Sequence, residues 1–172
     1  DDAIYEGNEV ATVAVSSVSG ADATENGSQS VSITVLENES APTVSLASSS
    51  ASIAENSASA ITLTATLSQI ADEAVTVSFS TSGVAVAGTD YASLSSITIA
   101  AGSATGTTSF TPTNDAIYEG DEVATVAVSS VSGADATESG SQSVSITVSE
   151  DESAPTVSLA SSSSSIAENS GS

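Results

Sequence analysis

The sequence predicts an all-β chain whose unit is a seven-stranded antiparallel β-sandwich of immunoglobulin-like shape. Apolar residues alternate with threonine and serine in several short segments, which is typical of half-buried strands. Residues that favour turns, glycine above all, separate these segments at short intervals. No segment carries a helical period. Seven such strands within about 110 residues fit two packed sheets.

The first three strands are expected at 43–54, 60–68 and 74–82. A serine run at 48–50 interrupts the first range, and we expect it to divide that strand in two. In the second range four apolar residues alternate with threonines from Ile61 to Leu67. The third range repeats this pattern with Val75, Val77 and Phe79. Each alternation predicts one face towards a core and one towards water.

The remaining four strands are expected at 95–100, 105–112, 122–130 and 142–149. Isoleucines flank a single threonine at 97–99, and apolar residues alternate with serine and threonine across 144–148. The pairs Ala101-Gly102 and Ser139-Gly140 supply turn residues between neighbouring strands.

The two ends of the chain nearly repeat each other at an offset of 113. Residues 1–59 and 114–172 differ at seven positions: Asp1/Asn114, Asn8/Asp121, Asn26/Ser139, Leu36/Ser149, Asn38/Asp151, Ala51/Ser164 and Ala58/Gly171. A period of this length suits a whole domain rather than a solenoid unit. We therefore expect tandem repeats of period 113, with the end of one at 1–41, a complete one at 42–153 and the start of the next at 154–172.

The charge composition excludes several classes of function. The chain has 22 acidic residues, a net charge of −22, and no Lys, Arg, His or Cys. We expect no nucleic-acid binding, which needs cationic side chains against phosphate, and no attraction to anionic membranes. No apolar stretch is long enough to insert in a membrane. Disulfides, thiolate zinc sites and histidine catalysis are excluded, and we expect no enzyme activity.

The acidic residues gather at the ends of the expected strands. Since the chain has no basic side chain, none of them can form an internal salt bridge. Like charges a few ångströms apart repel by about 1 kcal/mol per pair in water, and by more when partly desolvated. A hard divalent cation relieves this repulsion, and calcium accepts six to eight carboxylate and carbonyl oxygens in flexible geometry. Calcium is therefore the expected cofactor.

Four segments carry a resemblance to a known family. They are Ile53-Ala54-Glu55-Asn56, Ala87-Gly88-Thr89-Asp90-Tyr91, Asn114-Asp115-Ala116-Ile117-Tyr118-Glu119-Gly120-Asp121-Glu122 and Ile146-Thr147-Val148-Ser149-Glu150-Asp151-Glu152. In order and spacing, residues 42–153 resemble a Calx-beta domain, the module named from sodium–calcium exchangers and common in large bacterial surface proteins. The resemblance implies a calcium cluster at one end of the sandwich.

The resemblance also implies which residues bind the calcium. In the complete repeat they are Glu55, Asp90, Asn114, Asp115, Glu119, Glu150, Asp151, Glu152 and the backbone carbonyl of Ile117. In the partial repeats they are Asp1, Asp2, Glu6, Glu37, Glu39 and Glu168. Asn114 stands where the family often has an aspartate, and Asn38 replaces the acid that Asp151 supplies. We therefore expect fewer or weaker ions and unequal sites between repeats. Asp121 and Glu122 remain open between ligands and solvated charges.

The expected function is structural. Near-identical repeats with calcium at their ends suit a long extracellular stalk or filament, an adhesin or a surface or matrix fibre, most simply bacterial. The partners would be neighbouring repeats of the same polymer, in a continuing chain or by strand addition between subunits. The alternatives are a regulatory calcium-sensing module, as in the exchangers, and a ligand-binding adhesive domain. Near-identical copies favour a spacer over a sensor.

Overall fold

The computed structural model describes residues 2–168, which form strands, turns and irregular segments, with no helix among them. The strands are β1 (Ile4–Tyr5), β2 (Glu9–Ala14), β3 (Ser30–Val35), β4 (Thr43–Ser48), β5 (Ser52–Ala54), β6 (Ile61–Leu67), β7 (Ile70–Ala71), β8 (Val75–Gly83), β9 (Ile97–Ile99), β10 (Thr105–Phe110), β11 (Glu122–Ser132), β12 (Thr137–Glu138) and β13 (Ser143–Ser149). Within this range no helix has the length and apolar content needed to cross a membrane. The prediction of an all-β chain is confirmed.

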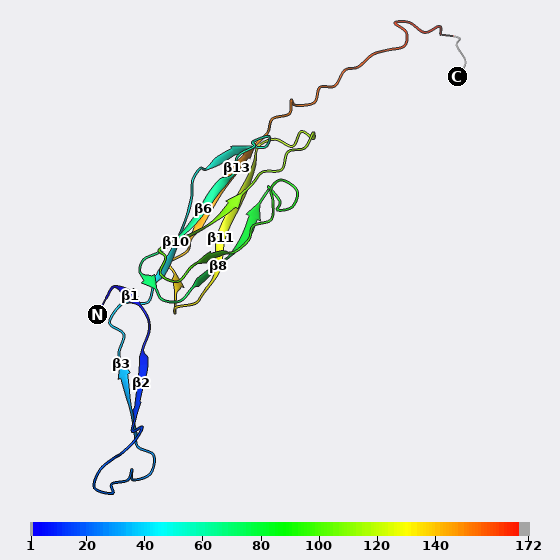
Figure 1. Ribbon diagram of the computed structural model, residues 1–172. Coiled ribbons are helices and arrows are strands. Elements are labelled where there is room, and N and C mark those ends of the chain that lie inside the picture. The colour runs from blue at the N-terminus through cyan, green and yellow to red at the C-terminus, as the bar shows by residue number, and fades with distance from the viewer. Residues whose placement is uncertain (1, 169–172) are drawn as a thin grey trace.

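Two sheets enclose the hydrophobic core (Figure 1). One has the strand order β10-β6-β4-β12, and the other has the order β5-β13-β11-β8-β9. Strands β8, β11 and β13 are antiparallel neighbours, and β11 carries a bulge between Val128 and Ser130 where it pairs with β8. The largest fully buried side chains include Leu63, Ile97 and Ile146, which come from both sheets. The molecule is therefore a β-sandwich.

The alternation in the sequence places the core correctly. In β6 the four apolar residues from Ile61 to Leu67 are all buried, whereas the intervening threonines are exposed or half-buried. Ile97 and Ile99 of β9 are buried on either side of an exposed threonine. The rings of Tyr91 and Phe110 are stacked with their centroids 4.4 Å apart, and both residues are fully buried. The small side chains of this sequence thus pack around a single aromatic pair.

The prediction of seven antiparallel strands is wrong in two respects. Residues 42–153 hold ten strands, because the first range divides into β4 and β5 and two-residue strands form at β7 and β12. Three pairings are also parallel, those of β1 with β7, β4 with β12 and β5 with β13. The break between β4 and β5 lies where the serine run predicts it. There the chain crosses from one sheet to the other. The Ser50 hydroxyl bonds the backbone of Ser52 in β5, and the Ser49 hydroxyl accepts from the Thr62 amide in β6.

The segments outside the sandwich expose residues that their counterparts bury. Hairpin β2–β3 is equivalent to β11–β13 at the offset of 113, and among the described residues its two strands pair only with each other. Val13 and Ile33 are 62% and 54% exposed, whereas their counterparts Val126 and Ile146 are 0% exposed. Residues 154–168 form no strand and extend from the opposite end (Figure 1). Identical sequence is therefore exposed wherever the remainder of a sandwich is missing.

Candidate metal centre

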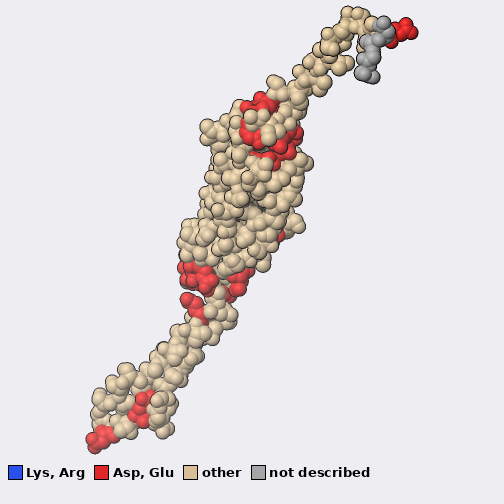
Figure 2. All heavy atoms as spheres, turned by 90° about the vertical axis from the view of Figure 1, so that its right-hand side faces the viewer, with Lys and Arg blue, Asp and Glu red and all other residues tan. Residues whose placement is uncertain are grey.

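One end of the sandwich gathers acidic residues from five parts of the chain (Figure 2). The end of β5, the loop before β9, the loop after β10, the start of β11 and the end of β13 all meet there. Antiparallel pairing of β11 with β13 brings Glu122 opposite Val148, two residues before the acidic segment 150–152. Parallel pairing of β5 with β13 brings Ala54 opposite Ser149, so that Glu55 adjoins the same segment.

The first carboxylate group comprises Glu55, Glu150, Asp151 and Glu152. One oxygen from each lies within 4.8 Å of the others. Glu55 is only 8% exposed, and its Oε1 accepts a hydrogen bond of 2.8 Å from the Asp115 amide. The Asn56 side chain donates to Asp151 Oδ2 at 2.8 Å. Three acidic side chains thus converge around the nearly buried Glu55 carboxylate, and the chain has no basic side chain to balance them.

Glu150 holds two loops together through its carboxylate. Its Oε2 accepts from the amides of Glu119 and Gly120 at 2.5 and 2.7 Å, and its Oε1 accepts from the amides of Asp151 and Glu152 at 3.0 Å each. These backbone hydrogen bonds, first that from Glu119, lower the pKa of Glu150 to about 2. Because a carboxylate has about four lone-pair positions, Glu150 acts first as a clamp on the loops and only then as a candidate ligand.

Glu152 places a buried carboxylate oxygen in the site without a hydrogen-bond donor. Its Oε2 is buried and has no hydrogen-bond partner. A hydrogen bond with the Glu150 side chain, burial and the charge of Asp151 raise the pKa of Glu152 to about 7. That hydrogen bond requires Glu152 to carry the proton, since both carboxylates are acceptors when ionised. The ionised oxygen therefore lacks the donor or cation that buried polar atoms normally have.

The second carboxylate group comprises Asp90, Glu119 and Glu122. Asp90 is 9% exposed, and its Oδ2 accepts from the Val86 amide at 2.6 Å. Burial and the charge of Asp90 raise the pKa of both Glu119 and Glu122. Gly83, with φ +117°, begins the loop that carries Asp90, and a Cβ there would lie 2.0 Å from the Val123 carbonyl oxygen. Only glycine permits this close approach of loop and strand.

Asp115 lies outside both carboxylate groups, and the expected ligands Asn114 and the Ile117 carbonyl are not carboxylates, so their roles stay predictions. Asp115 Oδ1 accepts from the Ile117 amide at 2.7 Å, which folds the loop back on itself, and its charge still contributes to the raised pKa of Glu119. The Asn114 side chain donates to the adjacent Asp115 carbonyl at 3.2 Å. Ile117 is 62% exposed. Asp115 and Asn114 therefore shape the loop between the groups.

Glu122 belongs to the second group although the sequence left its role open. It stands on the same side of β11 as Ala124 and Val126, which are both buried. A carboxylate on the core-facing side at the end of a strand is a signal that period-two counting can detect. The sequence also leaves the role of Asp121 open. Its Oδ1 accepts a hydrogen bond from the Glu150 amide at 3.0 Å, which ties the start of β11 to the segment after β13.

The first partial repeat reproduces the clamp. Glu37 Oε2 accepts from the amides of Glu6 and Gly7 at 2.6 and 2.7 Å, as Glu150 does 113 residues later. These bonds, with that from the Glu39 amide first, lower the pKa of Glu37 to about 2. Glu6, Gly7 and Glu37 line a cavity of about 120 Å³ together with Asp2 and Glu39. No convergent carboxylate group forms there among residues 2–41, because counterparts of Glu55 and Asp90 are missing from this segment.

Two further expected ligands stand apart. Glu168, the counterpart of Glu55, is exposed in the extended segment after residue 153. Asp1 lies outside the described residues.

The donor set fits a hard divalent cation. Both groups offer oxygen alone, and the chain contains no histidine or cysteine that would favour a transition metal. Two nearly buried acids and one partnerless buried oxygen need a positive charge that the sequence does not supply. Loops of mixed geometry, rather than a rigid octahedron, suit calcium better than magnesium.

A family comparison covers the whole of the sandwich. A family model described as "Calx-beta domain" matches residues 37–153. A crystal structure described as the apo form of the Calx CBD1 domain is 15% identical, with a TM-score of 0.52 over 63% of this chain and 97% of that one. A crystal structure of CBD12 from CALX1.2 is 16% identical, with a TM-score of 0.51 over 62% of this chain and 44% of that one. No curated protein matches this chain. At these identities the two structures show a shared fold.

Proposed function

The chain belongs to the Calx-beta domain family, and we propose that its residues 42–153 bind calcium at the acid-rich end as a structural unit of a long extracellular stalk or filament. One observation carries the calcium proposal. Seven carboxylates from separate parts of the chain converge in two groups in a protein without a single basic side chain. Repulsion at this density destabilises the folded end unless cations bind there.

Each of the two carboxylate groups would bind calcium through its own residues. Glu55, Asp151 and Glu152 would hold calcium in the first group, and Asp90, Glu119 and Glu122 would hold it in the second. Bound calcium supplies the missing positive charge and cross-links the loops. Glu150 keeps the 119–120 loop against the 150–152 segment before any ion binds, because its hydrogen bonds run to backbone amides. The clamp thus reduces the entropy lost on binding.

The repeat pattern supports a role as a spacer. Residues 1–59 and 114–172 differ at seven positions only, so successive units present the same ends to each other. Calcium at each end would fix a unit relative to its neighbour and stiffen a tandem array. Millimolar extracellular calcium suits modular sites of modest affinity, so we place this array at a cell surface, in a bacterial adhesin or matrix fibre. A sensor would need copies that differ, and an adhesive tip would need a distinct surface.

Thermal unfolding of the full chain tests the calcium proposal. Calcium at about 100 times its Kd stabilises a fold by about 2.7 kcal/mol, which raises the Tm of a domain of this size by about 10 °C. Scans with calcium, with magnesium and with a chelator should show the rise with calcium and a much smaller change with magnesium. Coincident transitions in calcium and chelator would contradict the proposal.

A further inference from the structure

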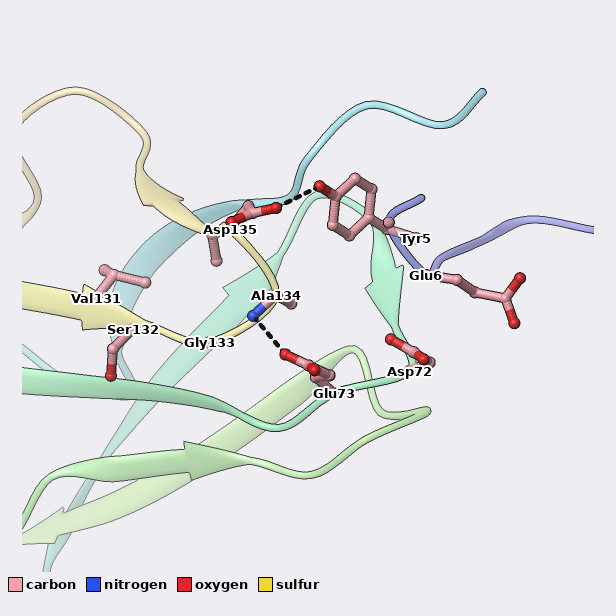
Figure 3. Close-up of a pocket in the computed structure, with 11 residues that line it drawn as sticks. Tyr5, Glu6, Asp72, Glu73, Val131, Ser132, Gly133, Ala134 and Asp135 are labelled. Carbon is pink, nitrogen blue, oxygen red and sulfur yellow. Dashed lines mark hydrogen bonds between the residues drawn. The ribbon is translucent and has the colours of Figure 1, made fainter. Parts of the chain in front are cut away.

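The loop at the start of the chain is docked on the end of the sandwich opposite the one from which residues 154–168 extend (Figure 1), and Figure 3 shows this contact close up. Strand β1 pairs in parallel with β7, with Ile4 opposite Ile70 and Tyr5 opposite Ala71. The Asp72 amide donates to the Tyr5 carbonyl at 3.1 Å, and the Gln69 side chain donates to the Ala3 carbonyl. Backbone and side-chain bonds therefore join the end of one repeat to the next.

Tyr5 is the side chain that crosses this contact. Its hydroxyl donates to Asp135 Oδ2 at 2.8 Å, a bond that Figure 3 marks, and this bond raises the pKa of Tyr5. The ring packs against the hydrophobic core. Beside it lies a cavity of about 530 Å³ that is lined by residues of both repeats. The contact is therefore partly apolar, and the Tyr5–Asp135 bond adds a side-chain to side-chain hydrogen bond to the bonds that Gln69 and Asp72 donate to backbone carbonyls.

The loop of residues 133–136, which accepts the Tyr5 hydrogen bond, has the same backbone conformation in the other copy, where no tyrosine of residues 2–168 contacts it. Ala134 and Asp135 are left-handed, with φ of 50° and 49°, and their counterparts Ala21 and Asp22 take φ of 49° and 56° in the exposed hairpin. A Cβ at Gly133, with φ +98°, would lie 2.2 Å from the Ala74 carbonyl oxygen, so the loop can approach β8 only through glycine. Two consecutive non-glycine residues in the left-handed region cost conformational energy. Both copies of the loop nevertheless adopt this conformation, so the acceptor loop is preformed whether or not a tyrosine contacts it.

The same pair of residues recurs, uncovered, at the other end of the molecule. Ile117 and Tyr118 are the counterparts of Ile4 and Tyr5, and they are 62% and 44% exposed, whereas Ile4 and Tyr5 are half-buried. The six residues from Asp115 to Gly120 are identical to those from Asp2 to Gly7. The exposed pair therefore has the residues, in the same loop, that make the observed contact 113 positions earlier.

We propose that Ile117 and Tyr118 form a docking surface for the base of a following copy of this repeat, the part equivalent to 69–72 and 133–136. The occupant is a second copy of this same repeat, because the chain itself shows that partner seated on the identical loop. This inference rests on the tandem arrangement proposed above and is independent of its calcium. One tyrosine–aspartate joint thus recurs once per repeat along the array.

Distance measurements between spin labels test the joint. The chain has no native cysteine, so Thr12→Cys on β2 and Thr107→Cys on β10 report only the first joint. In chelator, Tyr5→Phe should raise the undocked population by about 2- to 10-fold, as expected for the loss of one hydrogen bond. Tyr118→Phe is the matched control, and it should leave this distance distribution unchanged because its hydroxyl has no partner repeat in this chain.

An extended chain tests the recurrence. A second copy of residues 60–153 is added after Ser172, which completes the third repeat, and labels replace Thr125 and the threonine equivalent to Thr107. Tyr118→Phe should now raise the undocked population at the second joint as Tyr5→Phe does at the first. An unchanged distribution in the extended Tyr118→Phe chain, or in the original Tyr5→Phe chain, overturns the inference. Failure of calcium to bind these chains while the joints respond as expected would overturn only the calcium proposal.

Discussion

Among residues 2–168, Glu55 and Asp90 are the two acidic residues that the fold buries, at 8% and 9% exposure. Each accepts one backbone hydrogen bond, from Asp115 and from Val86. One such bond offsets only part of the cost of removing a charge from water. Each residue also lies in a different carboxylate group, so each adds repulsion to the acids around it. The fold keeps both residues at the same end, where a cation in each group would compensate them.

Asp90→Asn separates binding from stability. The neutral amide keeps an oxygen for the Val86 amide but removes one charge from the second group. We expect calcium affinity to fall by about 10-fold, since 1.4 kcal/mol corresponds to that factor, while the chain in chelator becomes more stable because repulsion is relieved. A calcium-dye competition assay and denaturation in chelator measure the two effects.

Asp22→Asn is the matched control for Asp90→Asn. It removes the same charge from the loop between β2 and β3, which lies far from the acid-rich end (Figure 1). The control should change neither calcium affinity nor stability in chelator. Equal losses of affinity in the two variants would show that the second group does not bind the ion.

Stability in the absence of calcium should depend on pH in a direction set by Glu152 and Glu150. The pKa of Glu152 is raised from 4.5 to about 7, so the folded state holds that proton more tightly. Its contribution is present below pH 4.5 and is lost as the pH rises to 7. The pKa of Glu150 is lowered from 4.5 to about 2, so its contribution is lost as the pH falls from 4.5 towards 2.

Denaturation in chelator should therefore give greatest stability near pH 4.5. Calcium competes with the Glu152 proton, so the stabilisation that calcium adds should grow between pH 4.5 and 7. Urea titrations at several pH values, with and without calcium, measure both trends. A stability that rises steadily from pH 4.5 to 7 in chelator would contradict this account of Glu152.

At the scale of elements, period-two alternation predicts the long strands and their buried faces, as β6 shows. The two-residue strands β7 and β12 could not be predicted from alternation, because two residues define no period. They form because β7 pairs with β1 and β12 pairs with β4. The resemblance to Calx-beta domains indicated the acid-rich end, which the fold assembles. The division into two groups depends on loop geometry around Asp90 and Glu150, which spacing alone does not contain.

Gly83→Ala should disrupt the loop that carries Asp90. The new Cβ would meet the Val123 carbonyl oxygen at 2.0 Å, in a backbone conformation that disfavours a side chain. Gly102→Ala is the control, since φ is +73° there but nothing lies within 4 Å of the new Cβ. We expect a loss of about 1 kcal/mol for Gly102→Ala from backbone strain alone and a larger loss for Gly83→Ala in urea denaturation. Equal losses would contradict the steric argument.

Hairpin β2–β3 and its counterpart β11–β13 form an internal comparison of nearly the same sequence. An isolated two-stranded hairpin is marginal in water, and its amides exchange by local opening. Hydrogen exchange followed by mass spectrometry should therefore show rapid exchange in β2 and β3 and strong protection in β11 and β13. Equal protection of the two hairpins would mean that the exposed faces of Val13 and Ile33 are covered in solution.

At the scale of the whole molecule, negative charge accumulates at both ends of the sandwich (Figure 2). The loop of residues 2–7, which matches the 115–120 loop of the acid-rich end, contacts the opposite end of the sandwich. The charges of Asp2 and Glu9 raise the pKa of Glu6 most, and Asp72 raises it further from across this contact. Without cations this repulsion opposes the hydrogen bond of Tyr5 to Asp135. Calcium at the acid-rich end would reduce the repulsion and favour the docked joint, so we expect metal binding and stiffness to be coupled through this loop.

Calorimetric titration of the chelator-treated full chain with calcium tests the central claim most directly. We predict saturable binding with a Kd on the order of 10⁻⁴ M or tighter, much weaker binding of magnesium, and loss of the calcium heat when Glu55→Gln and Asp90→Asn are combined. Absence of saturable calcium heat, or an unchanged isotherm in the double variant, would contradict the claim that these carboxylates form a calcium site.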